Sequence, residues 1–519
     1  MAKENSQFNG VRHVFINSLS NYIGRVVNMG AWIVLTPFIL SQLGDQKYGL
    51  WVLVGSVVSY GFLLDFGIAG AVTKYTAEFR AKRESDEAHS LIATVLWLYT
   101  GLGLFIILVS LIIAPLFPII FNIPEADRDM AIWLVMLSGI SVGITIPCTT
   151  TTAVLRGLQR FDLINLIGLA ATFLTAGGTV AVLLLDGGAI GLVLVGMGVT
   201  LISQIPGIWF IYRIAPELRF GWRGAKRSLL KRVASYSTSI FIMNLGGHLE
   251  SKTDEIVIGG FLPVSAVTPY NLARKLSTLP QTFTEQFLML LLPMASEIHA
   301  KEDREKLRTL YIVSTRLTLA MFLPVGLMLI ILAHPILSVW VGSAYAEYAY
   351  LIAILVIASL IDTSQWPAGF VLQGMARHQP LAAMTIGSGI SNLILSIILV
   401  NYYGLMGVAL GTLIPSTIVC IGFVAPYAMR VIGVSLQEMV TKVIWPTILP
   451  AIPMSIAIFA LRQIIEPVSL ISLLLVAGIG VLPYPIGYLL MSANEYERNL
   501  FRNNLWKFIR RVKLNLKQV

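Results

Sequence analysis

The stretch Ser239–Leu262 reads SIFIMNLGGHLESKTDEIVIGGFL, and its composition decides how the rest of the chain is interpreted. It is long enough to cross a bilayer, since a membrane-spanning helix needs about 20 residues. Its middle nevertheless carries five ionisable side chains, namely His248, Glu250, Lys252, Asp254 and Glu255. A charge at the bilayer centre costs about 2.5–3.5 kcal/mol on insertion scales, so such a helix must turn its charged face towards water or protein. We therefore predict that it forms one wall of an aqueous cavity inside a helical bundle; the alternative is a soluble amphipathic helix.

The composition of the whole chain decides between these alternatives. Of 519 residues, 56% are hydrophobic and only 12% are charged, whereas a soluble globular chain has about 25% charged residues. The chain is therefore predicted to be a polytopic membrane protein. Cys148 and Cys420 lie in apolar runs without metal-ligand spacing, and the sequence contains neither a Walker A loop nor an HExxH-like motif. We accordingly expect no metal, no cofactor, no catalytic residue and no enzyme activity.

Apolar stretches alternate with polar segments along the chain, and we interpret each apolar stretch as a membrane-spanning helix. There are fourteen of them, at residues 14–40, 48–72, 89–121, 130–155, 163–185, 189–212, 234–262, 266–293, 309–333, 348–374, 381–402, 405–429, 443–461 and 469–491.

The distribution of positive charge over the intervening loops predicts the orientation. With the N-terminus inside, 29 of the 37 Lys and Arg residues fall on the inner side, and only Lys47, Arg128 and Arg462 fall on the outer side. Cytoplasmic loops carry such an excess of Lys and Arg. We therefore expect both termini in the cytoplasm and the protein in the cell inner membrane. The net charge of +10 then needs no nucleic-acid partner.

The two halves of the chain resemble each other at a shift of 219 residues. Residues 77–91 (AEFRAKRESDEAHSL) fall on residues 296–310 (SEIHAKEDREKLRTL), and residues 12–20 fall on residues 231–239. These matches lie largely in polar loops, where apolar bias cannot produce them. Each repeat contains an even number of spans, so both halves enter the membrane from the same side, as in transporters built from parallel repeats.

The predicted fold is thus an all-α polytopic membrane protein with about 14 transmembrane helices in two parallel six-helix lobes. The predicted parts are an N-lobe at 1–212, a basic cytoplasmic linker at 213–232, a C-lobe at 233–430, a two-helix hairpin at 431–494 and a basic amphipathic cytoplasmic tail at 495–519.

Three segments resemble a known family. LGDQKYGLWVLVGSVVSYGFLLDFGIAGAVTKYTAE (Leu43–Glu78) resembles the signature of polysaccharide-repeat flippases, the Wzx-like branch of the multidrug/oligosaccharidyl-lipid/polysaccharide exporter superfamily. DEIVIGGFLPVSAVTPYNLARKL (Asp254–Leu276) resembles the start of the second lobe in that branch, and GRVVN after NSLSNYI (Asn17–Asn28) is similar to the first span of lipid II flippases. The resemblance implies two lobes that open alternately to either side, a lipid-linked saccharide as cargo, and coupling to an ion gradient or to the membrane potential.

Four basic residues within the predicted spans are candidates for binding the cargo: Arg25, Lys252, Arg274 and Lys275. Arg25 lies about 20 Å past Arg12 at 1.5 Å per helical residue, which is too deep for easy contact with the inner surface. A guanidinium stays charged and grips phosphate bidentately, so Arg25 suits the pyrophosphate of a polyprenyl-linked sugar. The alternative is a structural ion pair with Glu250 or Asp254. Arg316, in contrast, is expected to reach the membrane surface with its long side chain.

The acidic residues Glu250 and Asp254 are four residues apart and share a helix face. Intramembrane carboxylates often relay protons or ions, so we predict that these two couple transport to Na⁺ or H⁺. The alternative is ion pairing inside the cluster, for example between Lys252 and Glu255.

A second group of charges suits gates at the ends of the lobes. Asp65 and Glu285 occupy nearly matching places in the two repeats, and Lys74, Glu78 and Glu297 lie in or near matching inner loops. We predict that they form gating contacts; the alternative is a solvated surface, where ion pairs contribute little.

Together these features predict an alternating-access flippase for lipid-linked oligosaccharide or polysaccharide repeat units. The alternatives are a cation-coupled multidrug antiporter, which needs a cavity of net negative charge, and a lipid II flippase. Membrane lipids are expected partners. The protein is expected to be a monomer, with polysaccharide-assembly enzymes as candidate associates.

Overall fold

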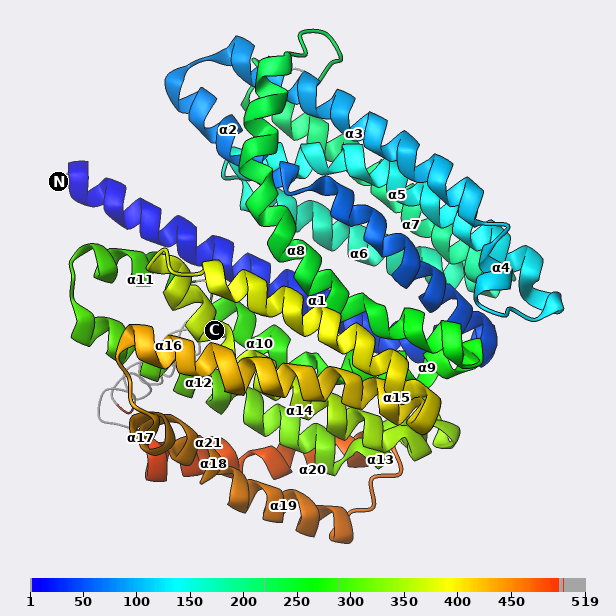
Figure 1. Cartoon of the computed structure of the whole chain (residues 1–519), viewed down its shortest axis with the longest axis vertical. Helices are drawn as coiled ribbons and strands as arrows, with labels where there is room; N and C mark the ends of the chain where they lie inside the picture. The colour runs from blue at the N-terminus through cyan, green and yellow to red at the C-terminus, as the bar shows by residue number, and fades with distance from the viewer. Residues whose placement is uncertain (1, 219, 289, 494–497, 499–519) are drawn as a thin grey trace, which may run out of the picture. The chain divides into compact units, whose positions relative to one another are not determined.

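The computed structural model describes residues 2–218, 220–288, 290–493 and 498; for residues 2–23, 234–246, 249–251 and 286 only the backbone is described. Every regular element in this part of the chain is a helix (Figure 1). The predicted all-α fold is thereby confirmed. The predicted tail at 495–519 lies outside the described residues, apart from Arg498.

The chain divides into two compact units, Met1–Leu272 with Ala382–Pro415, and Ala273–Leu381 with Ser416–Val519. This division does not follow the predicted lobes, because part of helix α15 (Gln379–Val419) groups with the first unit. The division into two six-helix lobes and a hairpin stays a prediction.

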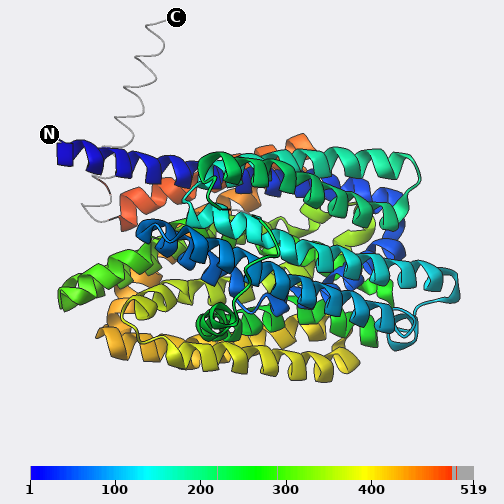
Figure 2. The ribbon, with the colours of Figure 1, turned by 90° about the horizontal axis from the view of Figure 1, so that it is seen from above.

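The first unit is built from helices that are mostly long enough to cross a membrane. Its elements before α15 are α1 (Ala2–Ser59), η1 (Tyr60–Asp65), α2 (Ile68–Lys82), α3 (Ser85–Ile113), α4 (Phe117–Ile120), η2 (Glu125–Asp127), α5 (Arg128–Gly157), α6 (Phe161–Leu184), α7 (Gly188–Ile214), α8 (Arg227–Phe261), η3 (Val264–Ala266) and the start of α9 (Val267–Ser277). The axes of α3, α5, α6 and α7 run nearly parallel or antiparallel, and α6 lies beside α7 (Figures 1 and 2).

Small residues let α3 and α5 approach closely. A Cβ atom added at Gly103 would lie 2.2 Å from the backbone oxygen of Gly143, and one added at Gly139 would lie 2.1 Å from Oγ of Ser110. Such contacts are typical of membrane helices, which associate through close packing and not through a hydrophobic driving force.

Two glycines divide elements that are otherwise continuous. Gly44 (φ 70°, ψ 170°) separates two helices within α1, and Gly404 (φ 56°, ψ −133°) does the same within α15. Only glycine adopts such backbone angles readily. Both positions lie between predicted spans, so the predicted breaks at residues 41–47 and 403–404 are confirmed.

The predicted span at 48–72 is not one continuous helix. After α1 ends, η1 follows, and Phe66 and Gly67 then take positive φ values of 48° and 75° before α2 begins. The predicted span at 266–293 is likewise divided, into α9, α10 (Leu279–Leu288) and the start of α11 (Leu291–Ala300).

Ten described helical ranges are long and apolar enough to cross a membrane. Two of these ranges contain the glycine breaks just described, and α8 is absent from the ten although it has 35 residues. The protein is a multi-pass membrane protein, and the count of fourteen spans stays a prediction.

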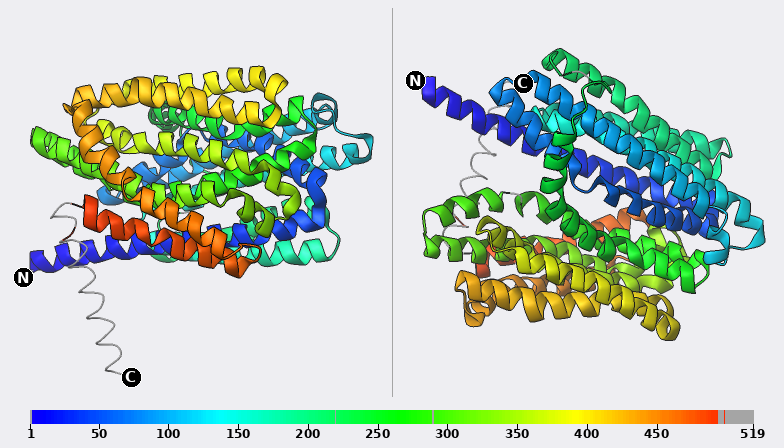
Figure 3. Two further views of the ribbon diagram at one scale, coloured as in Figure 1. Left: turned by 90° about the horizontal axis from the view of Figure 1, so that it is seen from below. Right: turned by 45° about the horizontal axis from the view of Figure 1, so that its top comes forward.

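The second unit forms two buried clusters around α12 (Arg304–Ile331). Its other elements are α10, α11, α13 (Ala333–Trp340), η4 (Ser343–Tyr348), α14 (Ala349–Gly374), η5 (Cys420–Val424), α16 (Ala425–Ile432), α17 (Leu436–Met439), η6 (Val440–Ile444), α18 (Trp445–Ile448), α19 (Ala451–Ile464), α20 (Leu470–Val481), α21 (Pro483–Gly487) and η7 (Tyr488–Ser492). One cluster joins α12 to α11, α14 and α16, and the other joins it to α19 and α20, which lie side by side (Figure 3).

Arg316 on α12 is only 6% exposed. The expectation that this side chain reaches the membrane surface is therefore wrong. Its position on α12 directs the side chain into the interior of the unit. There it is surrounded by protein and does not reach the membrane surface.

Candidate functional site

Helix α8 carries two adjacent carboxylates that are almost completely buried within the first unit. Asp254 is 0% exposed and Glu255 is 1% exposed, and the neighbouring Thr253 is also buried. Burying an ionised carboxylate is costly unless hydrogen-bond donors or charges compensate. The polar atoms around these two side chains therefore define the site.

Asp254 is held by two hydroxyl groups from different helices. The Tyr270 hydroxyl on α9 donates to Oδ2 at 2.6 Å, and the Thr412 hydroxyl on α15 donates to the same oxygen at 3.0 Å. Asn392, on the other side of the break at Gly404, donates from Nδ2 to Oγ1 of Thr412 at 2.9 Å. The site thus joins α8, α9 and both halves of α15.

The polar residues of α15 follow a helical spacing. Ser388, Asn392 and Ser396 are four residues apart, and all three are buried. Side chains four apart lie on the same helix face, so this half of α15 presents a polar stripe to the interior of the unit.

Glu255 belongs to a second branch of the network. Nδ2 of Asn271 lies 3.4 Å from Oε1 of Glu255, and Oδ1 of Asn271 accepts a hydrogen bond from the Tyr48 hydroxyl at 3.3 Å. Thr253, two residues before Glu255 on α8, extends this branch, because its hydroxyl lies 2.7 Å from the hydroxyl of Tyr60. These contacts connect α8 and α9 to the part of α1 that follows Gly44, and to η1.

The donor set limits the chemistry of this site. Among the described residues, no group of three His, Cys, Asp or Glu side chains could hold a metal ion. Carboxylate, hydroxyl and amide oxygens are instead suited to a proton or to a hard cation.

The predicted cargo residues lie on different elements. Arg25 on α1 and Lys252 on α8 are half-buried in the first unit, and Arg274 and Lys275 are half-buried in the part of α9 that belongs to the second unit. The side chain of Glu250 lies outside the described residues. Their joint role in binding the cargo stays a prediction.

The predicted gate residues have local partners. Asp65 accepts hydrogen bonds from the Tyr99 hydroxyl and from the backbone nitrogen of Ala69, and so holds the break between η1 and α2. Glu78 forms ion pairs with Lys82 at 2.8 Å and with Arg232 at 3.1 Å, which fastens α2 to α8.

The three other gate candidates are spread over both units. Lys74 lies over the ring of Tyr75 at 4.9 Å, and Glu285 is half-buried on α10. Glu297 on α11 pairs with Lys301 one turn later, and this contact lowers the pKa of the Glu297 carboxyl. A gating role for these residues stays a prediction.

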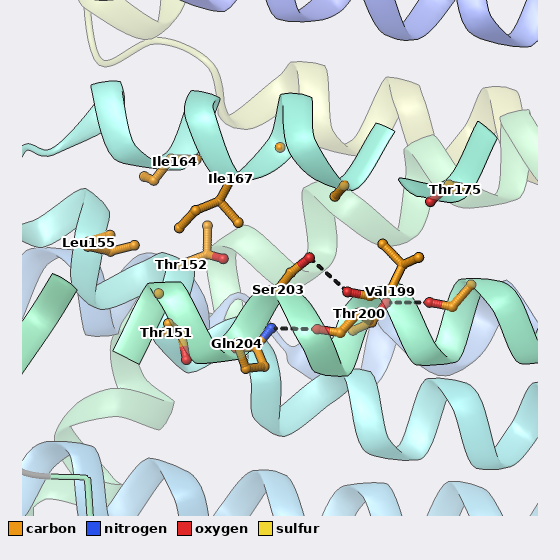
Figure 4. Close-up of a pocket in the computed structure, with 14 residues that line it drawn as sticks. Thr151, Thr152, Leu155, Ile164, Ile167, Thr175, Val199, Thr200, Ser203 and Gln204 are labelled. Atoms are coloured by element: carbon orange, nitrogen blue, oxygen red, sulfur yellow. Dashed lines mark hydrogen bonds between the residues drawn. The ribbon is translucent and has the colours of Figure 1, made fainter. Parts of the chain in front are cut away.

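A pocket between α5, α6 and α7 is a feature that sequence reasoning did not predict. It has a volume of about 440 Å³ and lies entirely in the first unit (Figure 4). Uncharged polar side chains from α5, α6 and α7 contribute to its lining, among them Thr151, Thr175, Thr200, Ser203 and Gln204. The available signal was the occurrence of threonine, serine and glutamine at helical spacing within apolar spans.

The network around Asp254 was also only half visible in the sequence. The acidic pair stood out by its charge, whereas Tyr270, Thr412 and Asn392 are ordinary residues of apolar helices. Tyr270 and Thr412 contact Asp254 directly. Asn392 contacts Thr412, and the contact between Thr412 and Asp254 spans 158 residues, which no local pattern encodes.

This combination of membrane-spanning helices and buried intramembrane polar groups is found in membrane transporters. The fold is the one seen in an inward closed structure of the lipid II flippase MurJ, with a TM-score of 0.73, 15% identity, and coverage of 94% of this chain and 100% of that one. It is also similar to an inward-facing multidrug resistance MATE family transporter of the MOP superfamily, with a TM-score of 0.68, 16% identity, and coverage of 80% and 98%.

The sequence model described as "Polysaccharide biosynthesis protein" matches residues 43–350, and the chain belongs to this family. Two relatives come from Haloferax volcanii. One is named "Probable low-salt glycan biosynthesis flippase Agl15", with 22% identity over 475 residues, 90% of this chain and 94% of the relative. The other is named "Probable flippase AglR", with 22% identity over 479 residues, 90% of this chain and 93% of the relative.

Proposed function

We propose that this protein is a flippase that moves a lipid-linked saccharide from the inner to the outer leaflet of the cell inner membrane, with both termini in the cytoplasm. The observation that carries the proposal is membership of the polysaccharide biosynthesis family over residues 43–350. The full-length similarity to relatives named as flippases supports it, as does the fold shared with MurJ.

The physical task of such a protein is to lower the cost of moving a charged head group through the bilayer, while the hydrocarbon tail stays in lipid. Arg25, Lys252, Arg274 and Lys275 are the side chains we assign to the pyrophosphate. Guanidinium and ammonium groups balance its negative charge.

The buried carboxylate Asp254 is our candidate for ion coupling, together with Glu250. Asp254 has two hydroxyl donors from α9 and α15, so binding of H⁺ or Na⁺ at this carboxylate would change how these helices are held together. A ligand shifts a conformational equilibrium only through such differential contacts. Asp65, Lys74, Glu78, Glu285 and Glu297 are proposed to stabilise closed ends of the transport path.

The proposal is tested by reconstituting the full-length protein into liposomes with a fluorescent polyprenyl-pyrophosphate oligosaccharide. A membrane-impermeant quencher reports how much substrate reaches the outer leaflet. We expect faster equilibration than in protein-free liposomes; equal rates would refute the proposed function.

The same liposomes test the role of Asp254. We expect the Asp254→Asn variant to insert normally but to lose the response of flipping to an imposed proton or sodium gradient. An unchanged response to both gradients would refute coupling at this residue.

The second candidate function is multidrug export by cation antiport, which the similarity to the MATE fold favours. Drug resistance on overexpression, without flipping of the lipid-linked saccharide, would support it. Lipid II itself is a third candidate cargo, because the fold matches MurJ; the same liposome assay with lipid II as substrate distinguishes it.

A further inference from the structure

The pocket between α5, α6 and α7 is lined by fourteen residues, none of which is charged. It lies between helices that are apolar and long enough to cross a membrane. Its volume of about 440 Å³ falls within the range of about 300–1,000 Å³ that is usual for small-molecule sites. The pocket therefore has room for a small molecule, and its lining offers no countercharge to an ion.

The polar side chains of α7 use their own donors within the helix. The Thr200 hydroxyl donates to the Gly196 carbonyl at 2.9 Å, and the Ser203 hydroxyl donates to the Val199 carbonyl at 2.7 Å (Figure 4). The Gln204 amide donates from Nε2 to the Thr200 carbonyl at 3.3 Å. The two hydroxyls have only acceptor lone pairs left to offer a ligand, and Gln204 has its amide oxygen and one N–H left.

One of these acceptors is buried without a partner. Oε1 of Gln204 is inaccessible to solvent and has no hydrogen-bond partner among the described residues. Leaving a buried polar atom unsatisfied is unfavourable, so an atom of this kind calls for an explanation. Because Gln204 lines the pocket, a rotation of its terminal amide would present this oxygen to a bound molecule that donates hydrogen bonds.

The rest of the lining is apolar. Ile164 and Ile167 come from α6, and Val199 comes from α7. A neutral sugar combines hydroxyl donors with apolar C–H faces and matches both kinds of surface. A prenyl chain would make no hydrogen bond with the polar part of the lining, and a phosphate would meet no positive charge among the lining residues.

The pocket also neighbours the helix that carries Arg25. Nδ2 of Asn28 lies 3.4 Å from Oγ1 of Thr172 on α6, and Thr172 is adjacent to the pocket residue Ala171. Arg25 and Asn28 are three residues apart and share a face of α1. A saccharide in the pocket would therefore lie beside the helix that we assign to the pyrophosphate.

We propose that the pocket between α5, α6 and α7 binds a neutral sugar unit of the cargo, an inference that rests on the proposed flippase function. The uncharged acceptors of α7 would then contribute to recognition of the saccharide, separately from the basic residues that recognise the pyrophosphate.

A binding experiment tests this without transport. The full-length protein carries Val199→Cys in a Cys148→Ser/Cys420→Ser background, and maleimide labelling is followed in nanodiscs. The probes are glucose, galactose, N-acetylglucosamine and maltose, with farnesol and inorganic pyrophosphate for comparison. We expect at least one sugar to slow labelling, and neither farnesol nor pyrophosphate to do so. Protection by farnesol alone, or by none of the sugars, would overturn the proposal.

A thiol at Gly198 is the matched control. Gly198 is on the same helix, does not line the pocket and has open space around an added Cβ atom. Sugar should leave labelling of the Gly198→Cys protein unchanged. Equal protection at both positions would also overturn the proposal, because it indicates a general effect on the protein.

Filling the pocket gives a second readout. A Cβ atom added at Gly196 or at Gly198 meets no atom within 4 Å, but only Gly196 lines the pocket. We expect Gly196→Val to reduce flipping at least tenfold at equal folded yield, and Gly198→Val to retain it. Full activity of both variants overturns the proposal. If the unmodified protein does not flip substrate but its Val199→Cys form is protected by sugar, the proposed function fails and the sugar site stands.

Discussion

Replacing Thr412 by valine tests the buried network at Asp254 most directly. Valine has nearly the same shape as threonine but lacks the hydroxyl that donates to Asp254 at 3.0 Å and accepts from Asn392 at 2.9 Å. A hydrogen bond to a charged group contributes about 1.5–3 kcal/mol, and one between neutral groups about 0.5–1.5 kcal/mol. The expected loss is therefore about 2–4 kcal/mol, since both partners remain buried.

Two measurements follow from this magnitude. Thermal unfolding of the purified protein in detergent should occur several degrees lower, because a loss of this size shifts the midpoint of a unit of a few hundred residues by that amount. If Asp254 binds the coupling cation, the cation concentration for half-maximal flipping should fall, because the lost hydroxyl stabilises the ion-free carboxylate; about 1.4 kcal/mol of that stabilisation corresponds to a factor of ten.

Thr412→Ser is the matched control, because it keeps the hydroxyl and removes only a methyl group. It should stay closer to the unmodified protein in cation dependence than Thr412→Val does. Identical behaviour of the two variants in both assays would refute the role assigned to the hydroxyl.

Three further predictions concern other parts of the chain. Arg25→Ala should abolish flipping with normal membrane insertion, and full activity in a flippase complementation assay would refute the phosphate role. Gly143→Val should destabilise the protein by about 1–3 kcal/mol through overpacking against α3, whereas Gly101→Val, where an added Cβ atom meets nothing within 4 Å, should not; unfolding midpoints compare the two. The carboxyl of Glu297 has a lowered pKa because of Lys301, so its contribution is present above the ordinary value of 4.5 and is lost as the pH falls through the lowered pKa. Because both side chains are exposed, Glu297→Gln should shift the unfolding midpoint only slightly at pH 7 and not at all once the carboxyl is protonated in acid; a larger shift in acid would contradict this.

The fold class could be predicted because membrane helices are specified locally. An apolar stretch of sufficient length is enough to predict a span, and the breaks at Gly44 and Gly404 follow from short polar segments that contain a glycine. The interruption at η1 was not predictable in the same way. Phe66 takes a positive φ of 48°, and no composition signal marks a bulky residue for that conformation.

The candidate site was predictable only where it is charged. Asp254 and Glu255 stand out because ionised groups are rare in apolar helices, and both proved to be buried. Arg316 stands out for the same reason, but the sequence did not indicate that it faces the protein interior. A single sequence shows that a charge lies in a span, and only the packing of the neighbouring helices determines which way it points.

Helix α1 connects the two polar regions of the first unit. Before Gly44, Asn28 contacts Thr172 on α6, next to the sugar pocket; after Gly44, Tyr48 donates to Asn271, which contacts Glu255. The two halves of α1 are thus fixed to different neighbours, and the break at Gly44 is the point between them where the backbone is not helical. The acidic network and the surroundings of the sugar pocket are therefore both attached to α1, and a change at either one acts on the same element. These contacts join residues that are 144 and 223 positions apart in the sequence, so the individual spans predict the elements of the first unit but not its site.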